Sequence, residues 1–377
     1  MTPPPTEARI FQVASTIGDE EVTAVTEVLR SGWLSEGQRS GRFVDAFLEV
    51  VGAPHGVLAP NGTLALMLAA TAAGLGPGDE VLVPDTTFYG SATAMCAVGA
   101  VPIPVEVDPD FFLLDLEAAE EAITKRTRGI MPVHLYGTSC DMAAVSEFAR
   151  RHGLVVIEDA AQGVGVTSGE HHVGSISDFG AFSFFADKTI TTGEGGFVTC
   201  TDSAMFDRLR FIRNQGRINR GSFVHDEFGI NYRMTDMQAA LGVVQLSRLP
   251  DIAKRKQETW GWYSEALEGL SGVRVIGAAP GSNHVPFRCV IMTDRGPAIR
   301  RGLEEAGVQV RTGFFPLHAQ PGLRAWFDVH GIAIPAGPNG FAASRCHYED
   351  AILLPVHQDV TQGDVDLIAD VVRGLVG

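Results

Sequence analysis

The feature that most constrains the fold is a regular alternation of short apolar strands and helical segments between residues 81 and 158. Strands are predicted at 81–84, 103–107, 129–133 and 154–158, and helices at 91–98, 116–123 and 142–151. Strict alternation of this kind predicts a mostly parallel sheet that helices cover on both faces. Ligands of such sheets bind outside the carboxyl ends of the strands, so functional residues are expected at that edge.

Two further helices are predicted upstream of this region. Residues 19–30 form an amphipathic pattern with Val22, Val25, Val28 and Leu29 on one face, and Gly32 follows where a left-handed cap belongs. The second helix is a buried one over the alanine-rich apolar run 64–70, directly after Asn61-Gly62-Thr63.

The pattern changes after residue 174. Strands are expected at 179–185 and 196–201, joined by a loop that carries Lys188, and the spacing of Thr235 and Gln238 predicts a capping box that opens a helix. Pro250 and the charged helical segment 251–267 mark a junction. Because 377 residues are many for one core, we expect a large domain over 1–250, N-terminal helix included, and a small α+β domain over 251–377.

Composition excludes several classes of function. A formal net charge of −16 argues against non-specific nucleic-acid binding, which needs clustered cations. No stretch is long and apolar enough to span a bilayer, and the first ten residues lack the apolar segment of a secretory signal. Five scattered cysteines without C-x-x-C pairs argue against a disulfide framework or a zinc site. We therefore expect a cytoplasmic enzyme or binding protein without a metal.

Local features at the expected binding edge indicate a ligand, although each has a plainer interpretation. Asn61-Gly62-Thr63 at a helix start favours an anion such as phosphate, or it marks a hairpin turn. Glu158 and Asp159, with Gln162 close behind, end a buried strand, where one acid could pair with a protonated ring nitrogen or simply cap a turn. Phe88 could stack on a planar ring or pack in the core.

A further feature is Lys188, which lies between an aromatic strand and a glycine-rich turn. Most lysines reach solvent, but a desolvated lysine is a nucleophile. An anion site, an aromatic face, a strand-end acid and a shielded lysine together match the needs of pyridoxal phosphate, whose aldehyde condenses with a lysine and whose ring accepts electrons.

The chain resembles the DegT/DnrJ/EryC1/StrS family of sugar aminotransferases, and the matching segments occur in the same order over almost its whole length. The segments that carry the resemblance are SGWLSEG (31–37), GDEVLVP (78–84), PVHLYG (132–137), EDAAQ (158–162), KTITTGEGG (188–196) and NYRMT (231–235). The resemblance implies a fold type I pyridoxal phosphate-dependent transferase, similar to aspartate aminotransferase, that works as a homodimer with shared active sites.

The resemblance also implies roles for single residues. Lys188 is the Schiff-base and proton-shuttle residue, Asp159 pairs with the pyridine nitrogen, and Gln162 bonds the ring hydroxyl. The remaining cofactor contacts implied are Gly62, Thr63 and Ser183 at the phosphate, Phe88 on the ring, and Asn231 from the neighbouring subunit. Substrate contacts are carried over to Trp33, Arg233, Arg311 and His318.

Two segments depart from the family pattern. Pro60-Asn61-Gly62-Thr63 stands where the family commonly has Ser-Ser-Gly-Thr, and Phe185-Ala186-Asp187 stands where it often has Tyr-Gly-Asn. Both departures are compatible with the implied cofactor contacts, but they make the substrate harder to infer from the resemblance.

The substrates implied are L-glutamate as amino donor and a nucleotide-linked keto-deoxy sugar as acceptor, which react in two half-reactions. Residues 188–196 look most like perosamine-type enzymes, which favours a 4-keto-6-deoxyhexose over a 3-keto sugar. A local basic patch for the nucleotide is expected from Arg213, Arg217, Arg220 and Arg233, any of which could instead form surface ion pairs.

The sequence argues against three other functions. A non-catalytic regulator of the family is disfavoured by the presence of Lys188 and Asp159 together, and a dehydratase of the family is disfavoured because such enzymes have histidine at the lysine position. Gly163-Val164-Gly165 after a strand could indicate a dinucleotide-dependent oxidoreductase, but that motif requires a helix directly after the glycines. A polar turn through His171 and His172 is expected there instead. These two histidines are expected to be loop residues, not metal ligands.

Overall fold

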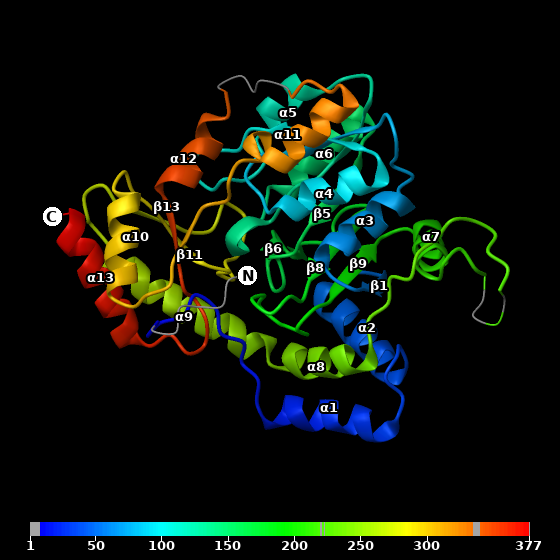
Figure 1. Cartoon of the computed structure of the whole chain (residues 1–377), viewed down its shortest axis with the longest axis horizontal. Helices are drawn as coiled ribbons and strands as arrows, with labels where there is room; N and C mark the ends of the chain where they lie inside the picture. The colour runs from blue at the N-terminus through cyan, green and yellow to red at the C-terminus, as the bar shows by residue number, and fades with distance from the viewer. Residues whose placement is uncertain (1–7, 219–220, 222, 335–339, 377) are drawn as a thin grey trace.

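The computed structural model describes residues 8–218, 221, 223–334 and 340–376. Its centre is a seven-stranded sheet in the order β1-β9-β8-β5-β4-β2-β3 (Figure 1). The strands are β1 His55–Ala59, β2 Glu80–Pro84, β3 Val101–Val105, β4 Thr127–Ile130, β5 Val155–Asp159, β8 Phe179–Ser183 and β9 Gly196–Cys200. All neighbours from β8 to β3 pair in parallel, whereas β9 runs antiparallel to β8 and β1. The prediction of a mostly parallel sheet is confirmed.

Helices cover both faces of this sheet, as predicted. The helices that connect or flank its strands are α3 Gly62–Ala72, α4 Tyr89–Val98, α5 Leu116–Ala122, α6 Met142–His152 and α7 Ser203–Arg213. The chain crosses the sheet in one direction from β2 to β3 and in the other from β3 to β5, so right-handed crossovers place α4 on one face and α5 and α6 on the other. Helices α2 Gln38–Val51 and α8 Asp236–Ser247 pack side by side in the lower part of Figure 1. The capping box at the start of α8 is present, with Thr235 Oγ1 accepting from Gln238 N.

Two strands lie slightly earlier than the sequence suggested. We expected 103–107 and 129–133, whereas β3 is Val101–Val105 and β4 is Thr127–Ile130. Pro102 and Pro104 made the start of β3 hard to predict from the sequence, because proline is normally excluded from paired strands. Proline is tolerated here because β3 is an edge strand of the sheet. Between Gly163 and Phe179 the expected polar turn contains a small hairpin, β6 Thr167–Ser168 with β7 His171–His172.

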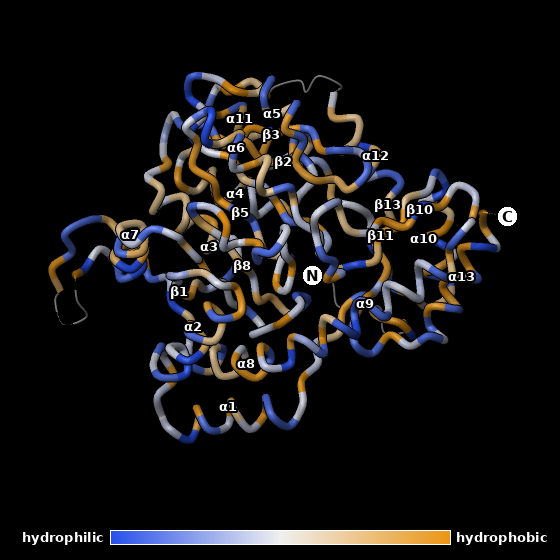
Figure 2. The backbone as a smooth tube through the Cα atoms, turned by 180° about the vertical axis from the view of Figure 1, so that it is seen from behind, coloured by the Kyte–Doolittle hydropathy of each residue, from blue (hydrophilic) through white to orange (hydrophobic). Residues whose placement is uncertain are grey.

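The N-terminal helix α1 spans Asp19–Ser31 and ends in a left-handed Gly32, as predicted. Its predicted apolar face is only partly correct: Val28 is buried, but Val22 is 58% exposed and Leu29 is 54% exposed. The buried side includes Glu21, whose carboxylate accepts from Gln245 and Arg248 of the α8 region. Figure 2 accordingly shows both hydrophilic and hydrophobic colour along α1.

A second, four-stranded antiparallel sheet follows in the order β10-β11-β13-β12. Its strands are β10 Arg274–Ile276, β11 Cys289–Met292, β12 Arg311–Thr312 and β13 Ala351–Leu354. The helices of this part are α9 Leu249–Ala266, α10 Gly296–Glu305, α11 Pro321–His330, α12 Ala342–Asp350 and α13 Gln362–Val376. The expected junction at 250/251 falls in the first turn of α9, and it remains a prediction.

An aromatic cluster underlies the strands that flank the lysine loop. The ring centroid of Phe47 lies 4.8 to 5.2 Å from those of Phe182, Phe184 and Phe197, and the centroids of Phe43 and Phe184 lie 5.1 Å apart. All five side chains are fully buried. Such close packing fixes the ends of β8 and β9 and therefore the loop between them. None of the helices in the described part of the chain has the length and apolar character that a membrane crossing requires.

Candidate active site

A cavity of about 1080 Å³ lies at the carboxyl ends of the central strands, where the sheet pattern predicted a binding site. Both sheets contribute to its wall. The large sheet and its loops supply Gly62, Asp159 and Lys188, and the small sheet and its loops supply Phe287 and Arg311. The cavity therefore collects side chains that are far apart in the sequence.

Lys188 projects into this cavity from the loop between β8 and β9. Its backbone N–H donates to Phe185 O at 2.9 Å, which tightens the turn that carries it. The Nζ atom lies 4.6 Å from the centroid of the Phe287 ring and 4.0 Å from Asp187 Oδ1. Burial lowers the pKa of Lys188 below its ordinary value, against the opposing effect of Asp187. A neutral amine at this position can act as a nucleophile or a base.

Asp159 is the acid that faces the cavity. Its backbone is fixed between neighbouring strands, because Asp159 N donates to Pro132 O and Asp159 O accepts from His134 N. Its carboxylate accepts from Ser91 Oγ at 2.7 Å and from Ala161 N at 3.1 Å. A carboxylate oriented by two donors in this way can accept a hydrogen bond from a protonated ring nitrogen.

Glu158, the preceding acid, points to the other face of β5, since successive side chains alternate along a strand. It is fully buried and pairs with His134 Nε2 at 3.0 Å. It also accepts from the backbone N–H groups of Gly174, Ile176 and Ser177. Glu158 is therefore committed to fixing the chain behind the sheet, which leaves Asp159 for the cavity.

Gln162 is oriented by a residue that the sequence did not single out. Tyr136 N donates to Gln162 Oε1 at 2.7 Å, so the Nε2 end of the amide is the part that can donate to a ligand. Tyr136 adopts a left-handed conformation with φ 56°, which is uncommon for a bulky residue. Its hydroxyl lies 2.9 Å from Nε2 of the buried His347, and this contact helps to hold the strained turn in place.

The start of α3 forms another part of the wall. Asn61 caps the helix by accepting from Leu64 N at 2.9 Å. The next backbone N–H groups, at Gly62 and Thr63, belong to the first turn, where a helix offers no internal partner. A Cβ atom at Gly62 would lie 2.8 Å from Ser183 Cβ, so the backbone and Ser183 approach closely here. This arrangement suits a phosphate group.

Eight of the predicted site residues line this one cavity. They are Gly62, Thr63, Phe88, Asp159, Gln162, Ser183, Lys188 and Arg311. Phe88 is 61% exposed, so its ring is not part of the core and is available for stacking. Four predicted residues do not line it: Trp33, Asn231, Arg233 and His318.

These four residues have other surroundings. Trp33 is exposed and its Nε1 donates to Glu36 O at 3.3 Å. Arg233 Nε donates to Asn231 Oδ1 at 2.7 Å, and both residues lie just before α8. His318 Nδ1 pairs with the buried Asp85 at 2.7 Å, and its ring stacks on Phe341.

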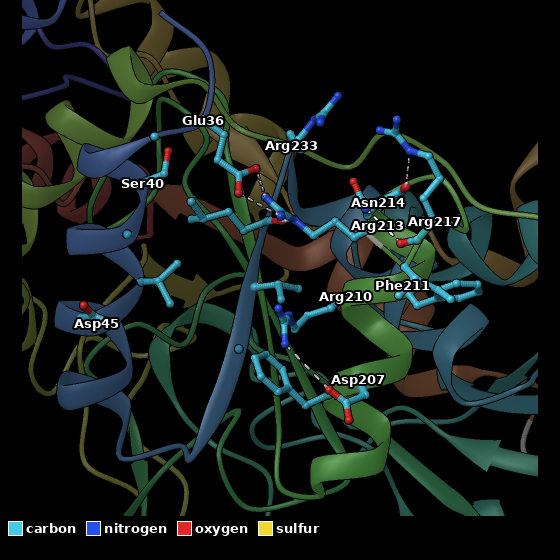
Figure 3. A pocket seen from close by; sticks show the side chains of 18 residues that line it. Glu36, Ser40, Asp45, Asp207, Arg210, Phe211, Arg213, Asn214, Arg217 and Arg233 are labelled. Atoms are coloured by element: carbon cyan, nitrogen blue, oxygen red, sulfur yellow. Dashed lines mark hydrogen bonds and ion pairs between the residues drawn. The ribbon is translucent and has the colours of Figure 1, made fainter. Parts of the chain in front are cut away.

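A second pocket of about 680 Å³ lies between α2 and α7 and contains part of the expected basic patch (Figure 3). Arg213, Arg217 and Arg233 line it, together with Arg210. Arg213 is held by contacts within the protein, since its Nη2 lies 2.5 Å from Glu36 Oε2 and its Nε donates to Leu58 O. Arg217 Nε donates to Asn214 O at 3.3 Å. Arg220 lies outside the described residues.

The main cavity fits pyridoxal phosphate by its chemistry. It offers an amine for an aldehyde, a held carboxylate for the pyridine nitrogen, a helix start for the phosphate and an aromatic face for the ring. The sequence missed Tyr136, Ser91, Phe287 and Arg288, which contact or orient these groups. Tyr136 lies in the segment 132–137 that carries the resemblance, but only three-dimensional proximity shows what these four residues contact.

Comparison with known proteins gives a consistent result. The model of the DegT/DnrJ/EryC1/StrS aminotransferase family matches residues 15–373. A GDP-perosamine synthase of Caulobacter vibrioides is 38% identical over 368 residues, covering 96% of each chain. A dTDP-3-amino-3,4,6-trideoxy-alpha-D-glucose transaminase of Streptomyces venezuelae is 37% identical, covering 80% of each.

Among solved structures, S. venezuelae DesV in complex with a ketimine intermediate superposes with a TM-score of 0.88 at 34% identity, covering 94% of each chain. The likeness therefore extends over both sheets of the molecule.

Proposed function

The chain belongs to the DegT/DnrJ/EryC1/StrS aminotransferase family and is a pyridoxal phosphate-dependent sugar aminotransferase, and within that activity we propose a specific reaction. The enzyme moves an amino group from L-glutamate to a nucleotide-linked 4-keto-6-deoxyhexose in two half-reactions. The observation that carries the proposal is the convergence of Lys188, Asp159 and the start of α3 in one cavity.

When bound, pyridoxal phosphate supplies an aldehyde that takes up the amino group and a ring that accepts the electron pair released at the reacting carbon. Asp159 keeps the pyridine nitrogen protonated, with Ser91 and Ala161 N holding its carboxylate in place. Lys188 moves the proton in both half-reactions, since burial favours its neutral form.

The other contacts follow from the shape of the wall. The N–H groups of Gly62 and Thr63 and the hydroxyl of Ser183 hold the phosphate. Phe88 covers the ring, and the Nε2 of Gln162, directed by Tyr136, donates to the ring hydroxyl. Arg311 lies on the small-sheet side of the cavity, where it receives an anionic part of the substrate.

The choice of a 4-keto acceptor rests on two similarities. Residues 188–196 resemble perosamine-type enzymes, and the relative named GDP-perosamine synthase is similar over 96% of the chain. The alternative is a 3-keto sugar, which is supported by the 37% identity to the relative named as a 3-amino-sugar transaminase. The two positions differ in which sugar carbon faces Lys188, so substrate assays decide between them.

We also propose a cytoplasmic homodimer with shared active sites. The described residues of the segment that follows α7 extend away from the body of the molecule (Figure 1), and they include Phe223, whose side chain is 90% exposed. Val22 and Leu29 of α1 are exposed as well. A second copy of the chain would cover these apolar side chains and would bring Asn231 into its partner's cavity. The free cysteines fit a reducing compartment.

The first test is an absorbance spectrum of the purified protein with pyridoxal phosphate, before and after L-glutamate. A visible band that shifts on addition of glutamate supports the donor half-reaction, and amination of GDP-, UDP- or dTDP-linked 4-keto sugars, with 3-keto sugars in parallel, then tests the acceptor. A band that no amino donor changes would contradict the proposal and favour the non-catalytic regulator.

A further inference from the structure

Asp187, directly before the reactive lysine, occupies a position where the family often has asparagine. Its side chain is 12% exposed, and its two oxygens have different surroundings. Oδ2 accepts from Arg288 Nη2 at 2.9 Å. Oδ1 lies 4.0 Å from Lys188 Nζ and has no hydrogen-bond partner among the described residues. The carboxylate therefore stands between two cationic groups.

Arg288 reaches this position from the other sheet. It directly precedes β11, and its side chain is 5% exposed. Its Nη1 donates to Phe287 O at 2.7 Å, and its guanidinium carbon lies 4.1 Å from the centroid of the Phe287 ring. Lys188 Nζ lies 4.6 Å from the same ring. Arg288 is thus held by contacts within the protein and lies against the same aromatic ring as Lys188.

We propose that Asp187 and Arg288 form a positioning pair that sets the protonation and the orientation of Lys188 in the transamination reaction. This inference rests on the proposed function of Lys188. Asp187 favours a proton on the Lys188 nitrogen, Arg288 disfavours it, and their ion pair keeps the two effects in balance.

The burial of the pair explains why both charges are present. A buried carboxylate without a partner is costly, so the acidic residue at 187 requires a cation nearby. Arg288 supplies it from 101 residues later in the chain. Burial lowers the pKa of Arg288 to about 10, against the opposing effect of Asp187, so the guanidinium remains charged at neutral pH.

Other charged groups near this pair also affect the pKa values of Lys188 and Arg288. Lys188 also faces Asp159 and Arg311, and Arg288 faces Tyr136 and Arg311. Behind the pair, Lys256 is buried, and this burial lowers its pKa to about 7. Its Nζ donates to Val356 O at 3.0 Å, so it is held by backbone and not by Asp187. None of these groups is substituted in the variants below, although Asp187 and Arg288 also act on the pKa of Lys256.

The experiment is a pH titration of the visible absorbance of the protein reconstituted with pyridoxal phosphate, without any amino donor. The variants are Asp187→Asn, Arg288→Met, the double variant and the charge-conserving Arg288→Lys. A charge 4 to 6 Å away shifts a titration by about one pH unit or more. The midpoint should therefore fall by about one unit in Asp187→Asn, rise by about one unit in Arg288→Met, and return close to the wild-type value in the double variant.

Arg288→Lys keeps the charge and should stay near the wild-type midpoint, which guards against a variant that fails because the buried Asp187 is left unpaired. Arg248→Met serves as a matched control, since it removes a half-buried ion pair with Glu21 away from the cavity. That variant should not move the midpoint.

The outcomes separate this inference from the function on which it rests. A wild-type protein without a visible band refutes both. A normal band whose midpoint stays in place in both single variants overturns the pair alone, even if the KM for the donor changes, because that result would make Arg288 a substrate contact. Shifts of both single variants in the same direction would overturn it as well, and so would a double variant whose midpoint stays about as far from the wild-type value as that of a single variant.

Discussion

Asp236 offers the sharpest test of how the structure around the site is held together. It is the first residue of α8 and is buried, yet its carboxylate caps a different helix. Oδ1 accepts from Gly37 N at 2.7 Å, from Ser40 N at 2.9 Å and from Ser40 Oγ at 2.6 Å, and Oδ2 accepts from Arg39 N at 3.1 Å. The N-cap of α2 is Gly37, which has no side chain to do this.

Asp236→Ala removes the acceptor for all four donors at once. A hydrogen bond to a charged group contributes about 1.5–3 kcal/mol, and loss of an N-cap costs about 0.5–2 kcal/mol. The four bonds share one carboxylate, so they do not add up independently, and we expect the free energy of unfolding to fall by about 3 kcal/mol. Asp236→Asn keeps one acceptor oxygen and should lose about half as much.

The effect of Asp236 also depends on pH. Burial raises the pKa of Asp236, but the hydrogen bonds from Ser40, Arg39 and Gly37 outweigh it, and the net pKa lies below the ordinary value of 3.8. Because the folded pKa is the lower one, the stabilisation is complete above the unfolded pKa and is lost as the pH falls through the folded pKa. The difference between wild type and Asp236→Ala should therefore be largest at neutral pH and shrink below about pH 4.

Urea unfolding followed by circular dichroism at a fixed protein concentration measures these differences, with the concentration fixed because a dimer links stability to it. A loss of less than about 1 kcal/mol in Asp236→Ala at pH 7 would refute the reasoning. So would a difference that is independent of pH. Ser247→Ala, at the exposed end of the same helix, is a suitable control.

Three further predictions concern the site and its surroundings. Lys188→Ala should lower turnover by at least about 10²–10⁴-fold with an unchanged circular dichroism spectrum, and retained transamination would contradict the role of the lysine. Gly62→Ala places a Cβ 2.8 Å from that of Ser183 and should weaken cofactor binding about tenfold, since overpacking costs about 1–3 kcal/mol; an unchanged dissociation constant in a cofactor titration would count against the phosphate site. Burial lowers the pKa of His347 from 6.5 to about 3, so the unfolded chain takes up a proton first and the free energy of unfolding should fall as the pH drops from about 6.5 towards 3. His347→Gln should show a shallower fall in the same denaturation series, and an identical slope would contradict this.

Much of the fold could be read from local sequence pattern. The alternation from β2 to β5 depends on short apolar runs whose type is set by their neighbours in the chain, and it was predicted correctly. The helix α2 was not predicted, although it packs two fully buried phenylalanines, Phe43 and Phe47, under the central sheet. Its start has glycine instead of a capping side chain, and the cap comes from Asp236, 199 residues away. No local signal could show that helix start.

The residues of the candidate site also fall into a group that local sequence pattern predicts and a group that it does not. Lys188, Asp159 and the start of α3 follow directly from their places at the ends of strands and helices, and all lie in one cavity. Tyr136, which orients Gln162, and Arg288, which pairs with Asp187, act through contacts between distant segments. The contact between His318 and Asp85 also joins distant segments, since 233 residues separate the two, and no sequence spacing could indicate it.

The division of the cavity between two sheets has a consequence for protein engineering. The groups proposed for the chemistry, Lys188 and Asp159, come from the large sheet, whereas Arg311, Phe314 and Leu353 come from the small-sheet side. A library that recombines 311–315 among relatives should therefore alter acceptor choice while the proton-transfer groups stay in place. A larger graft that replaces the segment around β11 is different, because it would exchange Arg288 without Asp187. Such chimaeras should therefore take Asp187 and Arg288 from the same parent protein.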